Sequence, residues 1–256
     1  MTGRLKNKVA IVTGGASGFG EGIVKKFVAE GAQVLIADRD LPKALDVAAA
    51  VGPAARALKV DVANAQDVRL MMETAELHFG RIDILINNAG VTHVPTPLED
   101  VSEEDFDRIT AVNMKAIYLA MREVVPRMKA NALGHQGIRG VVLNMASTAG
   151  VSPRPRLGWY NASKGWVITA TRANAVELAP FGIRVCALNP VAGETPLLRS
   201  FMGEDTPEIR AKFLSTIPIG RFSQPEDLAN ASCFLCSDEA SMITGVCMEV
   251  DGGRCI

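Results

Sequence analysis

The sequence predicts an α/β fold in which helices cover both faces of a parallel sheet. Short apolar runs typical of strands lie near residues 9–13, 33–38, 55–61, 82–87, 139–145, 183–189 and 246–250. Helical patterns separate them at about 41–51, 64–79, 103–130, 161–179 and 225–236. Runs this apolar are expected of strands buried between two helical layers. We therefore expect a doubly wound sheet of about seven strands, without repeats or an interdomain linker.

The first predicted strand leads directly into a glycine-rich turn. The apolar run at 9–13 precedes the segment 14–20, which holds four glycines and opens an amphipathic helical pattern. Glycine in such a turn lets backbone N–H groups approach a pyrophosphate, and a helix N-terminus favours negative charge. Asp38 ends the next strand about twenty residues later, where its carboxylate would accept hydrogen bonds from both adenosine ribose hydroxyls. This spacing predicts NAD as the cofactor, and capping of the next helix is the alternative role for Asp38.

Tyr160 and Lys164 are the pair that points to chemistry. They lie four residues apart in a helical pattern, so their side chains share one face. A free tyrosine hydroxyl has a pKa of about 10 and is a poor base at neutral pH. A neighbouring ammonium would lower that pKa and make Tyr160 usable for proton transfer. Taken alone, the pair also fits a core aromatic beside a solvated lysine.

Three motifs together resemble those of the short-chain dehydrogenase/reductase family. They are the glycine pattern Thr13-Gly-x-x-x-Gly-x-Gly20, the segment Asn87 to Gly90, and Tyr160-x-x-x-Lys164. The resemblance runs from about Lys8 to Gly253, and the joint spacing is highly specific. It implies a single Rossmann-type NAD(P)-binding domain over residues 1–256. It also implies an NAD-dependent oxidoreductase that transfers a hydride between the nicotinamide and a secondary alcohol or ketone.

The resemblance implies a catalytic set made up of Asn113, Ser147, Tyr160 and Lys164. Tyr160 would act as acid and base, while Lys164 would lower its pKa and hold the nicotinamide ribose. Ser147 would hydrogen-bond the substrate oxygen, and Asn113 would anchor a water that links Lys164 to solvent.

The same resemblance assigns cofactor contacts along the chain, including Asp61 at the adenine ring. The expected cofactor-binding residues are Gly14, Ser17, Gly18, Phe19, Gly20, Asp38, Arg39, Asp61, Val62, Asn88, Ala89, Gly90, Tyr160, Lys164, Pro190, Gly193 and Thr195.

Two positions depart from the family's pattern. Phe19 replaces the usual isoleucine of the glycine turn, a change of bulk that should leave phosphate binding intact. Val191 follows Pro190 where the family usually has glycine, so the backbone path there is an open question. Thr195 keeps its expected place, where its hydroxyl would bond the nicotinamide amide or a phosphate.

The stretch from Gly193 to Phe222 is long, contains several prolines and has its own short helical pattern at 207–215. It follows the carboxyl end of a strand, where ligands bind in open α/β sheets, so we expect a lid over the substrate, with a plain connection as the alternative. The side chains expected around the substrate are Ser147, Tyr160, His93, Val94, Met145, Thr148, Pro153, Arg154, Trp159, Leu197 and Met202. Arg154 and Arg156 would face an anionic group or remain solvated.

Two other functions compete with an NAD-dependent alcohol dehydrogenase. A 3-oxoacyl-thioester (acyl carrier protein) reductase of the same family would normally favour NADPH. Asp38 argues against that cofactor, while Arg39 could meet a 2′-phosphate. A dinucleotide-binding sensor or scaffold without turnover would show a broken catalytic set, and here the set is intact.

Composition limits the partners. The net charge of −1 gives no reason to expect nucleic acid or an anionic membrane. No signal-peptide segment precedes the first strand and no apolar run approaches transmembrane length, so we expect a cytoplasmic protein that acts on a small molecule. The five cysteines form no disulfide framework, Cys233 and Cys236 read as core residues, and no metal site is visible.

The chain's last strand predicts assembly. The stretch 244–256 is interpreted as a final apolar strand that Gly253 ends, with a short tail after it. This strand would add to one edge of the sheet and leave apolar side chains exposed in a monomer. The family resemblance implies that this strand and the 161–179 helix pack across two-fold axes. We therefore expect a homotetramer, with a dimer as the alternative.

Overall fold

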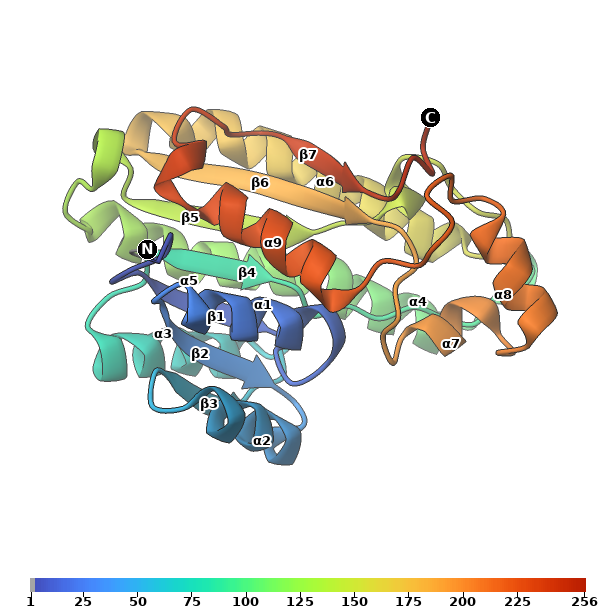
Figure 1. The fold of residues 1–256 in the computed structure, drawn as a ribbon, viewed down its shortest axis with the longest axis horizontal. Helices are drawn as coiled ribbons and strands as arrows, with labels where there is room; N and C mark the ends of the chain where they lie inside the picture. Colours follow the sequence, from blue (N-terminus) through green and yellow to red (C-terminus); the bar gives the residue numbers. More distant parts are fainter. Residues whose placement is uncertain (1–2) are drawn as a thin grey trace.

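A computed structural model describes residues 3–256; Met1 and Thr2, which open the domain expected over 1–256, lie outside the described residues. Seven strands form one parallel sheet in the order β3-β2-β1-β4-β5-β6-β7 (Figure 1). Their bounds are β1 Val9–Thr13, β2 Gln33–Asp38, β3 Ala55–Lys59, β4 Ile84–Asn87, β5 Gly140–Met145, β6 Ile183–Pro190 and β7 Cys247–Val250. The order reverses between β1 and β4, so the predicted doubly wound, Rossmann-like sheet is confirmed.

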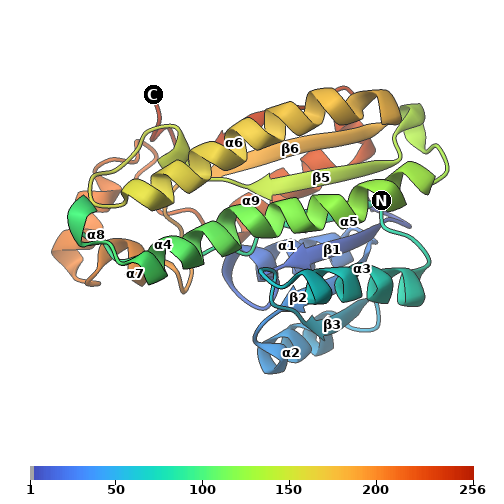
Figure 2. The same cartoon turned by 180° about the vertical axis from the view of Figure 1, so that it is seen from behind.

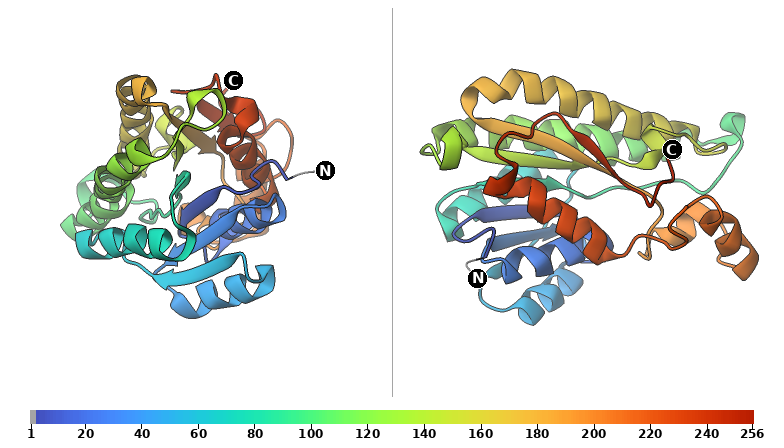
Figure 3. Two further views of the ribbon diagram at one scale, coloured as in Figure 1. Left: turned by 90° about the vertical axis from the view of Figure 1, so that its left-hand side faces the viewer. Right: turned by 45° about the horizontal axis from the view of Figure 1, so that its top comes forward.

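Helices cover both faces of this sheet (Figures 1 and 2). One face carries α1 (Gly18–Ala29), α2 (Leu41–Val51) and α9 (Pro225–Cys236). The opposite face carries α3 (Ala65–Phe79), α5 (Ala116–Ala130) and α6 (Gly158–Leu178). The left-hand view of Figure 3 shows the two helical layers with the sheet between them.

Alternation along the strands builds the two cores. Successive side chains of a strand point to opposite faces of the sheet. In β1, Ile11 packs with α3 and α5, whereas Ala10 and Val12 pack with α1 and α9. All five residues of β1 are buried, which explains why its sequence is apolar throughout rather than alternating.

The helical pattern predicted over 103–130 is not one regular α-helix. α4 (Glu103–Ile109) passes through a π-helical turn, η2 (Thr110–Lys115), into α5. Turns of this kind are rare and often lie at functional sites. Asn113, one of the expected catalytic residues, lies within this turn and is buried.

The segment between β6 and α9, residues 191–224, lies beyond the carboxyl ends of the strands (Figures 1 and 3). It contains α7 (Leu198–Met202) and α8 (Pro207–Leu214), and α8 agrees closely with the helix predicted at 207–215. A small apolar core of its own holds it together, formed by Val191, Leu198, Met202, Ile217 and Phe222. Within residues 3–256, no helix has the length and apolar character needed to span a bilayer.

Candidate active site

The glycine turn after β1 brings the backbone close to the open end of the sheet. Gly14 adopts a φ of +63°, and a Cβ built on Gly20 would collide with the Gly14 carbonyl oxygen. Glycine is therefore required at position 20 for steric reasons. Ser17 occupies the N-cap of α1 without a hydrogen bond from its hydroxyl to the helix. The first turn of α1 thus presents free N–H groups and a free hydroxyl, as phosphate binding needs.

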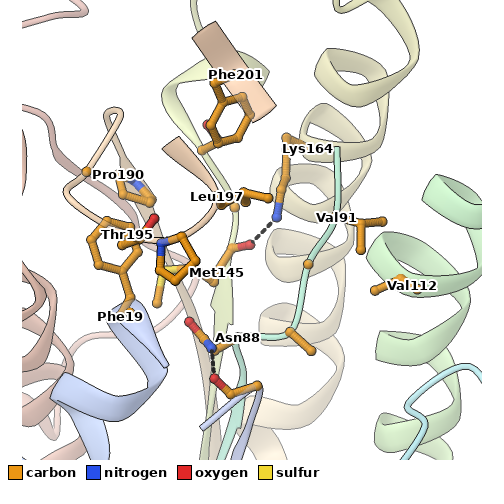
Figure 4. Close-up of a pocket in the computed structure, with 18 of the residues that line it drawn as sticks. Phe19, Asn88, Val91, Val112, Met145, Lys164, Pro190, Thr195, Leu197 and Phe201 are labelled. Carbon is orange, nitrogen blue, oxygen red and sulfur yellow. Dashed lines mark hydrogen bonds between the residues drawn. The ribbon is translucent and has the colours of Figure 1, made fainter. Parts of the chain in front are cut away.

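The segment after β4 locks this turn in place. The Asn88 amide donates to the carbonyl oxygens of Thr13 and Gly14 at 2.9 and 3.0 Å (Figure 4). The Thr13 hydroxyl in turn accepts hydrogen bonds from the backbone N–H groups of Asn88 and Ala89 at 3.0 and 3.1 Å. Two of the motifs found in the sequence therefore form one hydrogen-bonded unit at the switch point of the sheet.

Asp38 and Asp61 mark the far end of the same cleft, after β2 and β3. Asp38 accepts hydrogen bonds from the backbone N–H groups of Ala16 and Asp40, each at 3.0 Å, which fix its carboxylate at the rim. The cap of α2 is Asp40, whose side chain accepts from the Lys43 N–H, so capping is not the role of Asp38. Carboxylates fixed in this way fit the hydroxyls of an adenosine ribose.

A cleft of about 400 Å³ joins these parts at the carboxyl edge of the sheet. All the expected cofactor-binding residues line it except Gly20, which is buried beneath the turn. The cleft also takes in residues that the sequence did not single out, and these include Val60, Val91, Val112, Ala146, Leu157, Pro196 and Phe201. The residues present therefore fit a dinucleotide along the cleft.

Ser147, Tyr160 and Lys164 meet in the middle of the cleft wall. Ser147 follows β5 and caps the short helical turn η4 (Thr148–Gly150), while Tyr160 and Lys164 lie on the first two turns of α6. A Cβ at Gly150 would stand 2.7 Å from the backbone carbon of Lys164, so glycine there lets this turn press against α6. The Lys164 ammonium donates to the Met145 carbonyl oxygen at 2.7 Å (Figure 4).

A buried polar chain fixes α6 against the sheet. The Asn87 amide donates to Asn144 at 2.8 Å, and the Asn144 amide donates to the Thr171 hydroxyl at 2.9 Å. The chain joins β4, β5 and α6. Because buried polar groups are costly without partners, this chain holds α6, which carries Tyr160 and Lys164, in one position along the sheet.

Burial dominates the titration of the pair on α6. It raises the pKa of Tyr160 to about 12, against smaller downward effects of the Ser147 hydroxyl and the Arg154 charge. It lowers the pKa of Lys164 to about 8. The downward effects on the pKa of Tyr160 come from Ser147 and Arg154 and not from Lys164, so the expectation that Lys164 depresses this pKa finds no support here.

Asn113 lies behind the cleft wall rather than on it. Its amide donates to the Val91 carbonyl at 2.9 Å and to the Ser163 hydroxyl at 3.0 Å, and its carbonyl oxygen accepts from the Val91 N–H at 2.9 Å. A Cβ at Gly90 would stand 3.5 Å from the Lys164 nitrogen and 3.6 Å from the Asn113 oxygen. The carbonyl oxygen of Asn113 keeps one free lone pair, which is compatible with the expected water.

The substrate end of the cleft is lined by Met145, Thr148, Arg154, Leu197 and the unanticipated Phe201. The rings of Phe201 and Tyr160 meet edge to face, with centroids 5.1 Å apart. Of the other side chains expected here, Met202 is buried in the apolar core of the 191–224 segment. His93, Val94, Pro153 and Trp159 do not line the cleft; His93 is buried, with its Nδ1 2.7 Å from the Val94 carbonyl oxygen.

The two departures from the family's pattern are both accommodated. Val191 is buried and its φ is not positive, so the backbone there needs no glycine. Gly193, two residues on, is the position that requires glycine, because a Cβ there would collide with the Phe19 ring. The large side chain of Phe19 thus packs directly beneath the start of the 191–224 segment (Figure 4).

Metal ligation has no candidate in the described part of the chain. Among residues 3–256, no group of three or more His, Cys, Asp and Glu side chains is placed to hold a metal ion. Cys233 and Cys236 are buried in the core beneath α9.

The fold and the cleft define a class, a dinucleotide-binding oxidoreductase with a buried serine, tyrosine and lysine beside the cofactor's place. Comparison with known proteins agrees with this class. Residues 14–254 match the family model described as enoyl-(acyl carrier protein) reductase. The chain is 45% identical to 4-formylbenzenesulfonate dehydrogenase of Comamonas testosteroni over 98% of each chain. It is 38% identical to galactitol 2-dehydrogenase of Agrobacterium fabrum, again over 98% of each.

A solved structure is similar in both sequence and shape. The 3-ketoacyl-(acyl-carrier-protein) reductase of Brucella melitensis, in complex with NADH, superposes with a TM-score of 0.92 at 51% identity. The match covers 98% of this chain and 100% of that one. The chain belongs to the short-chain dehydrogenase/reductase family and is an oxidoreductase that uses a nicotinamide cofactor.

Proposed function

We propose that the chain is an NAD-dependent dehydrogenase that oxidises a secondary alcohol of a small molecule to a ketone, or catalyses the reverse reduction. The observation that carries this proposal is the meeting of Ser147, Tyr160 and Lys164 on one wall of the cleft that starts at the glycine turn. Oxidation breaks the C–H and O–H bonds of the carbinol. NAD⁺, when bound, takes up the hydride, and the hydroxyl proton leaves to the Tyr160 oxygen.

Each residue has a role that follows from its position. The Ser147 hydroxyl would hydrogen-bond the substrate oxygen and hold it against Tyr160. Because burial favours the protonated tyrosine, Tyr160 is set up as a proton donor for reduction at neutral pH. The nearby positive charge of Arg154 would favour the phenolate in the opposite direction. Asn113 would hold a water next to Lys164, by which the proton reaches solvent.

The choice of NAD over NADP rests on Asp38. Its fixed carboxylate would repel a 2′-phosphate and accept hydrogen bonds from the ribose hydroxyls. The NADH named with the Brucella structure supports the same choice. Arg39 lines the cleft beside Asp38 and is the one feature that favours NADP.

A second candidate is reduction of a 3-ketoacyl thioester, and the likeness to the Brucella reductase favours it. The names of the curated relatives point elsewhere. One acts on 4-formylbenzenesulfonate, which is anionic and aromatic, and another on galactitol, which is neutral. Since these substrates differ in charge and size, the substrate has to be argued from the cleft of this chain.

We also propose that residues 193–222 act as a lid within a single domain over 1–256, and that the enzyme is a cytoplasmic homotetramer. The lid is supported by Leu197 and Phe201, which reach the cleft from α7.

Assembly is supported by β7, which ends the sheet, and by exposed apolar side chains on α5 and α6, Tyr118, Trp166 and Val176. Light scattering that gives a monomer at micromolar concentration would contradict the tetramer, and deleting 244–256 should dissociate or precipitate the protein.

A direct assay tests the proposed reaction. The purified chain is mixed with NAD⁺ or NADP⁺ and a panel of secondary alcohols and sugars, or with NADH and a panel of ketones that includes acetoacetyl thioester, and absorbance of the reduced cofactor is followed. We expect turnover with NAD on small alcohols and ketones. Turnover on the thioester alone, with NADPH, would favour the second candidate. Tight cofactor binding without turnover on any panel would indicate a sensor or scaffold.

A further inference from the structure

The substrate end of the cleft contains an arginine without a counter-charge. Arg154, on the turn between β5 and α6, lines the cleft together with Tyr160 and Phe201. Its guanidinium stacks on the ring of Phe213 in α8, 4.4 Å from the ring centroid. Throughout residues 3–256, no carboxylate lies within ion-pair distance of Arg154.

A second arginine approaches from the end of the chain. Arg254, in the tail after β7, donates to the Ser152 hydroxyl at 3.1 Å, and its Nε is buried without a hydrogen-bond partner in the described structure. The nearest acid in the tail, Asp251, is engaged elsewhere. Its two carboxylate oxygens accept from the backbone N–H groups of Gly253 and Cys255 at 2.9 and 2.8 Å. Arg254 therefore brings its positive charge toward Arg154 without a neutralising partner.

The two charges act on each other. Burial, and after it the charge of Arg254, lower the pKa of Arg154, which means that its cationic form is destabilised where it stands. A partly buried cation next to another cation costs free energy unless an anion joins them. Proteins commonly keep such an arrangement for a ligand that supplies the missing charge.

Charge is also distributed unevenly along the cleft. The acidic residues that line it are Asp38, the last residue of β2, and Asp61, which follows β3; Arg39 lies beside Asp38. Arg154 and Lys164 line the end formed by β5 and α6, and no acidic residue accompanies them there among the residues of the described cleft wall. The sheet places β1 and β4 between β2 and β5, so the acids stand across the width of the cofactor site from the arginines.

We propose, resting on the function proposed above, that the substrate is a small organic anion whose carboxylate or sulfonate binds Arg154, with Arg254 behind it as a second positive charge. A planar guanidinium offers two parallel N–H donors to the oxygens of such a group. The reacting carbon lies at Tyr160, and the anionic group lies toward α8. Because Phe213 of α8 stacks on Arg154, a substrate bound to Arg154 is also linked to the 191–224 segment.

The test measures anion binding independently of turnover. The enzyme saturated with NADH is titrated calorimetrically with benzoate, benzenesulfonate and the neutral isostere benzamide. We expect the two anions to bind at least about tenfold more tightly than benzamide, and comparing them shows which head group fits. Arg154→Gln should remove this preference, Arg154→Lys should keep part of it, and Arg254→Gln should reduce it by a smaller factor.

The matched control is Arg156→Gln. Arg156 is exposed, lies two residues from Arg154 and does not line the cleft, so this variant removes the same charge from the surface and should keep the anion preference. The proposal is overturned if wild type binds the anions no better than benzamide, or if the preference survives Arg154→Gln. The second result would mean that Arg154 serves only to stack on Phe213.

A kinetic comparison separates this proposal from the proposed reaction. Reduction of 4-acetylbenzoate and of 4-acetylbenzamide is followed with NADH. Arg154→Gln should raise KM for the anionic ketone by about tenfold or more relative to its effect on KM for the neutral ketone, whereas Arg156→Gln should leave the kinetics of both ketones unchanged. If both ketones are turned over without a preference for the anionic one, the arginine site is contradicted and the proposed reaction still stands. A preference in binding without turnover of any ketone or alcohol contradicts the proposed reaction and leaves the arginine site standing.

Discussion

The two walls of the cleft are built differently. On the cofactor side, hydrogen bonds between side chains and backbone groups hold the glycine turn to the segment after β4 and to Asp38, and β1 and β4 are fully buried. On the substrate side, α8 has no buried residue, and the arginine ion pairs that fix it, between Arg210 and both Asp205 and Glu194, lie at the surface. The wall on the cofactor side is stabilised by the fold as a whole. The wall on the substrate side is stabilised by the small apolar core of the 191–224 segment.

This difference shows which part of the site is set by the chemistry and which part can adapt. The proposed hydride transfer needs the nicotinamide, Ser147 and Tyr160 at fixed separations, which a rigid wall would supply. The lid proposed at residues 193–222 would have to open for substrate and product, and weakly held elements suit that role. Substitutions on the cofactor side should therefore change turnover or stability strongly. Substitutions in the proposed lid should have smaller effects on both.

The largest effect is expected for Tyr160→Phe. The ring and its contact with Phe201 stay, but the hydroxyl that transfers the proton is lost. Acid–base catalysis contributes about 10²–10⁴-fold, so kcat should fall by at least that factor while NADH still binds. Steady-state kinetics and NADH fluorescence titration measure the two quantities. Near-normal turnover would show that the rigid wall does not hold the acid/base.

Lys164→Met should reveal the cost of burying an ammonium. The folded-state pKa of about 8 lies below the ordinary lysine value of 10.5, so the unfolded chain binds more protons between these pH values and wild-type stability rises with pH. Relative to Lys164→Met, wild type should gain roughly 2 kcal/mol in unfolding free energy from pH 7 to pH 10. Urea unfolding at a series of pH values measures this gain, and a pH-independent difference would contradict it.

Gly193→Ala tests the contact that joins the two walls. The added methyl group would collide with the Phe19 ring, and overpacking of this kind costs about 1–3 kcal/mol. Combining it with Phe19→Ala should restore part of the stability, because the colliding ring is then removed. Thermal unfolding of the two single variants and the double variant gives the coupling. Strictly additive effects would mean that Phe19 and Gly193 do not meet.

Asp38→Ala should change cofactor choice without abolishing the reaction. Losing the carboxylate removes its hydrogen bonds to the ribose and its repulsion of a 2′-phosphate, so the ratio of NADP to NAD dissociation constants should shrink by roughly tenfold. Asp40→Ala is the matched control, since it removes a neighbouring carboxylate that caps α2. Calorimetry measures both ratios, and a wild-type preference for NADP would overturn the choice of NAD.

The smallest effect is expected for Arg210→Gln on the lid. Its ion pairs with Asp205 and Glu194 join side chains that are each about a third exposed, and such pairs contribute about 0–1 kcal/mol. The global unfolding free energy should hardly change, while hydrogen exchange in α8 should become faster. A global loss of several kcal/mol would show that the lid is as firmly built as the cofactor wall.

The cofactor side was predictable from the sequence because its signals are local. The glycines directly follow a buried strand, Asp38 ends the next strand about twenty residues later, and Tyr160 lies one helical turn from Lys164. The seven strands follow from apolar runs in the same way. The π-helical turn at Asn113 gave no such signal, because one extra residue in a helix hardly alters the apolar pattern over 103–130.

The substrate side was harder to predict because tertiary packing decides it. α7 is five residues long, too short for a helical period to be read, and its rotation turns Phe201 toward Tyr160 and Met202 into the small core. His93 was expected near the substrate from its place in the chain, but its backbone segment folds inward. The pKa of Tyr160 depends on burial, which the spacing of Tyr160 and Lys164 does not report.

The C-terminal tail has a consequence for how the proposed anion preference can be adjusted. Arg254 approaches the substrate end from beyond the last strand, in a turn held by the Asp251 carboxylate. No strand, helix or catalytic residue has to move when that position changes. A replacement of Arg254 would therefore adjust the anion preference proposed for Arg154 without disturbing the residues that line the cleft.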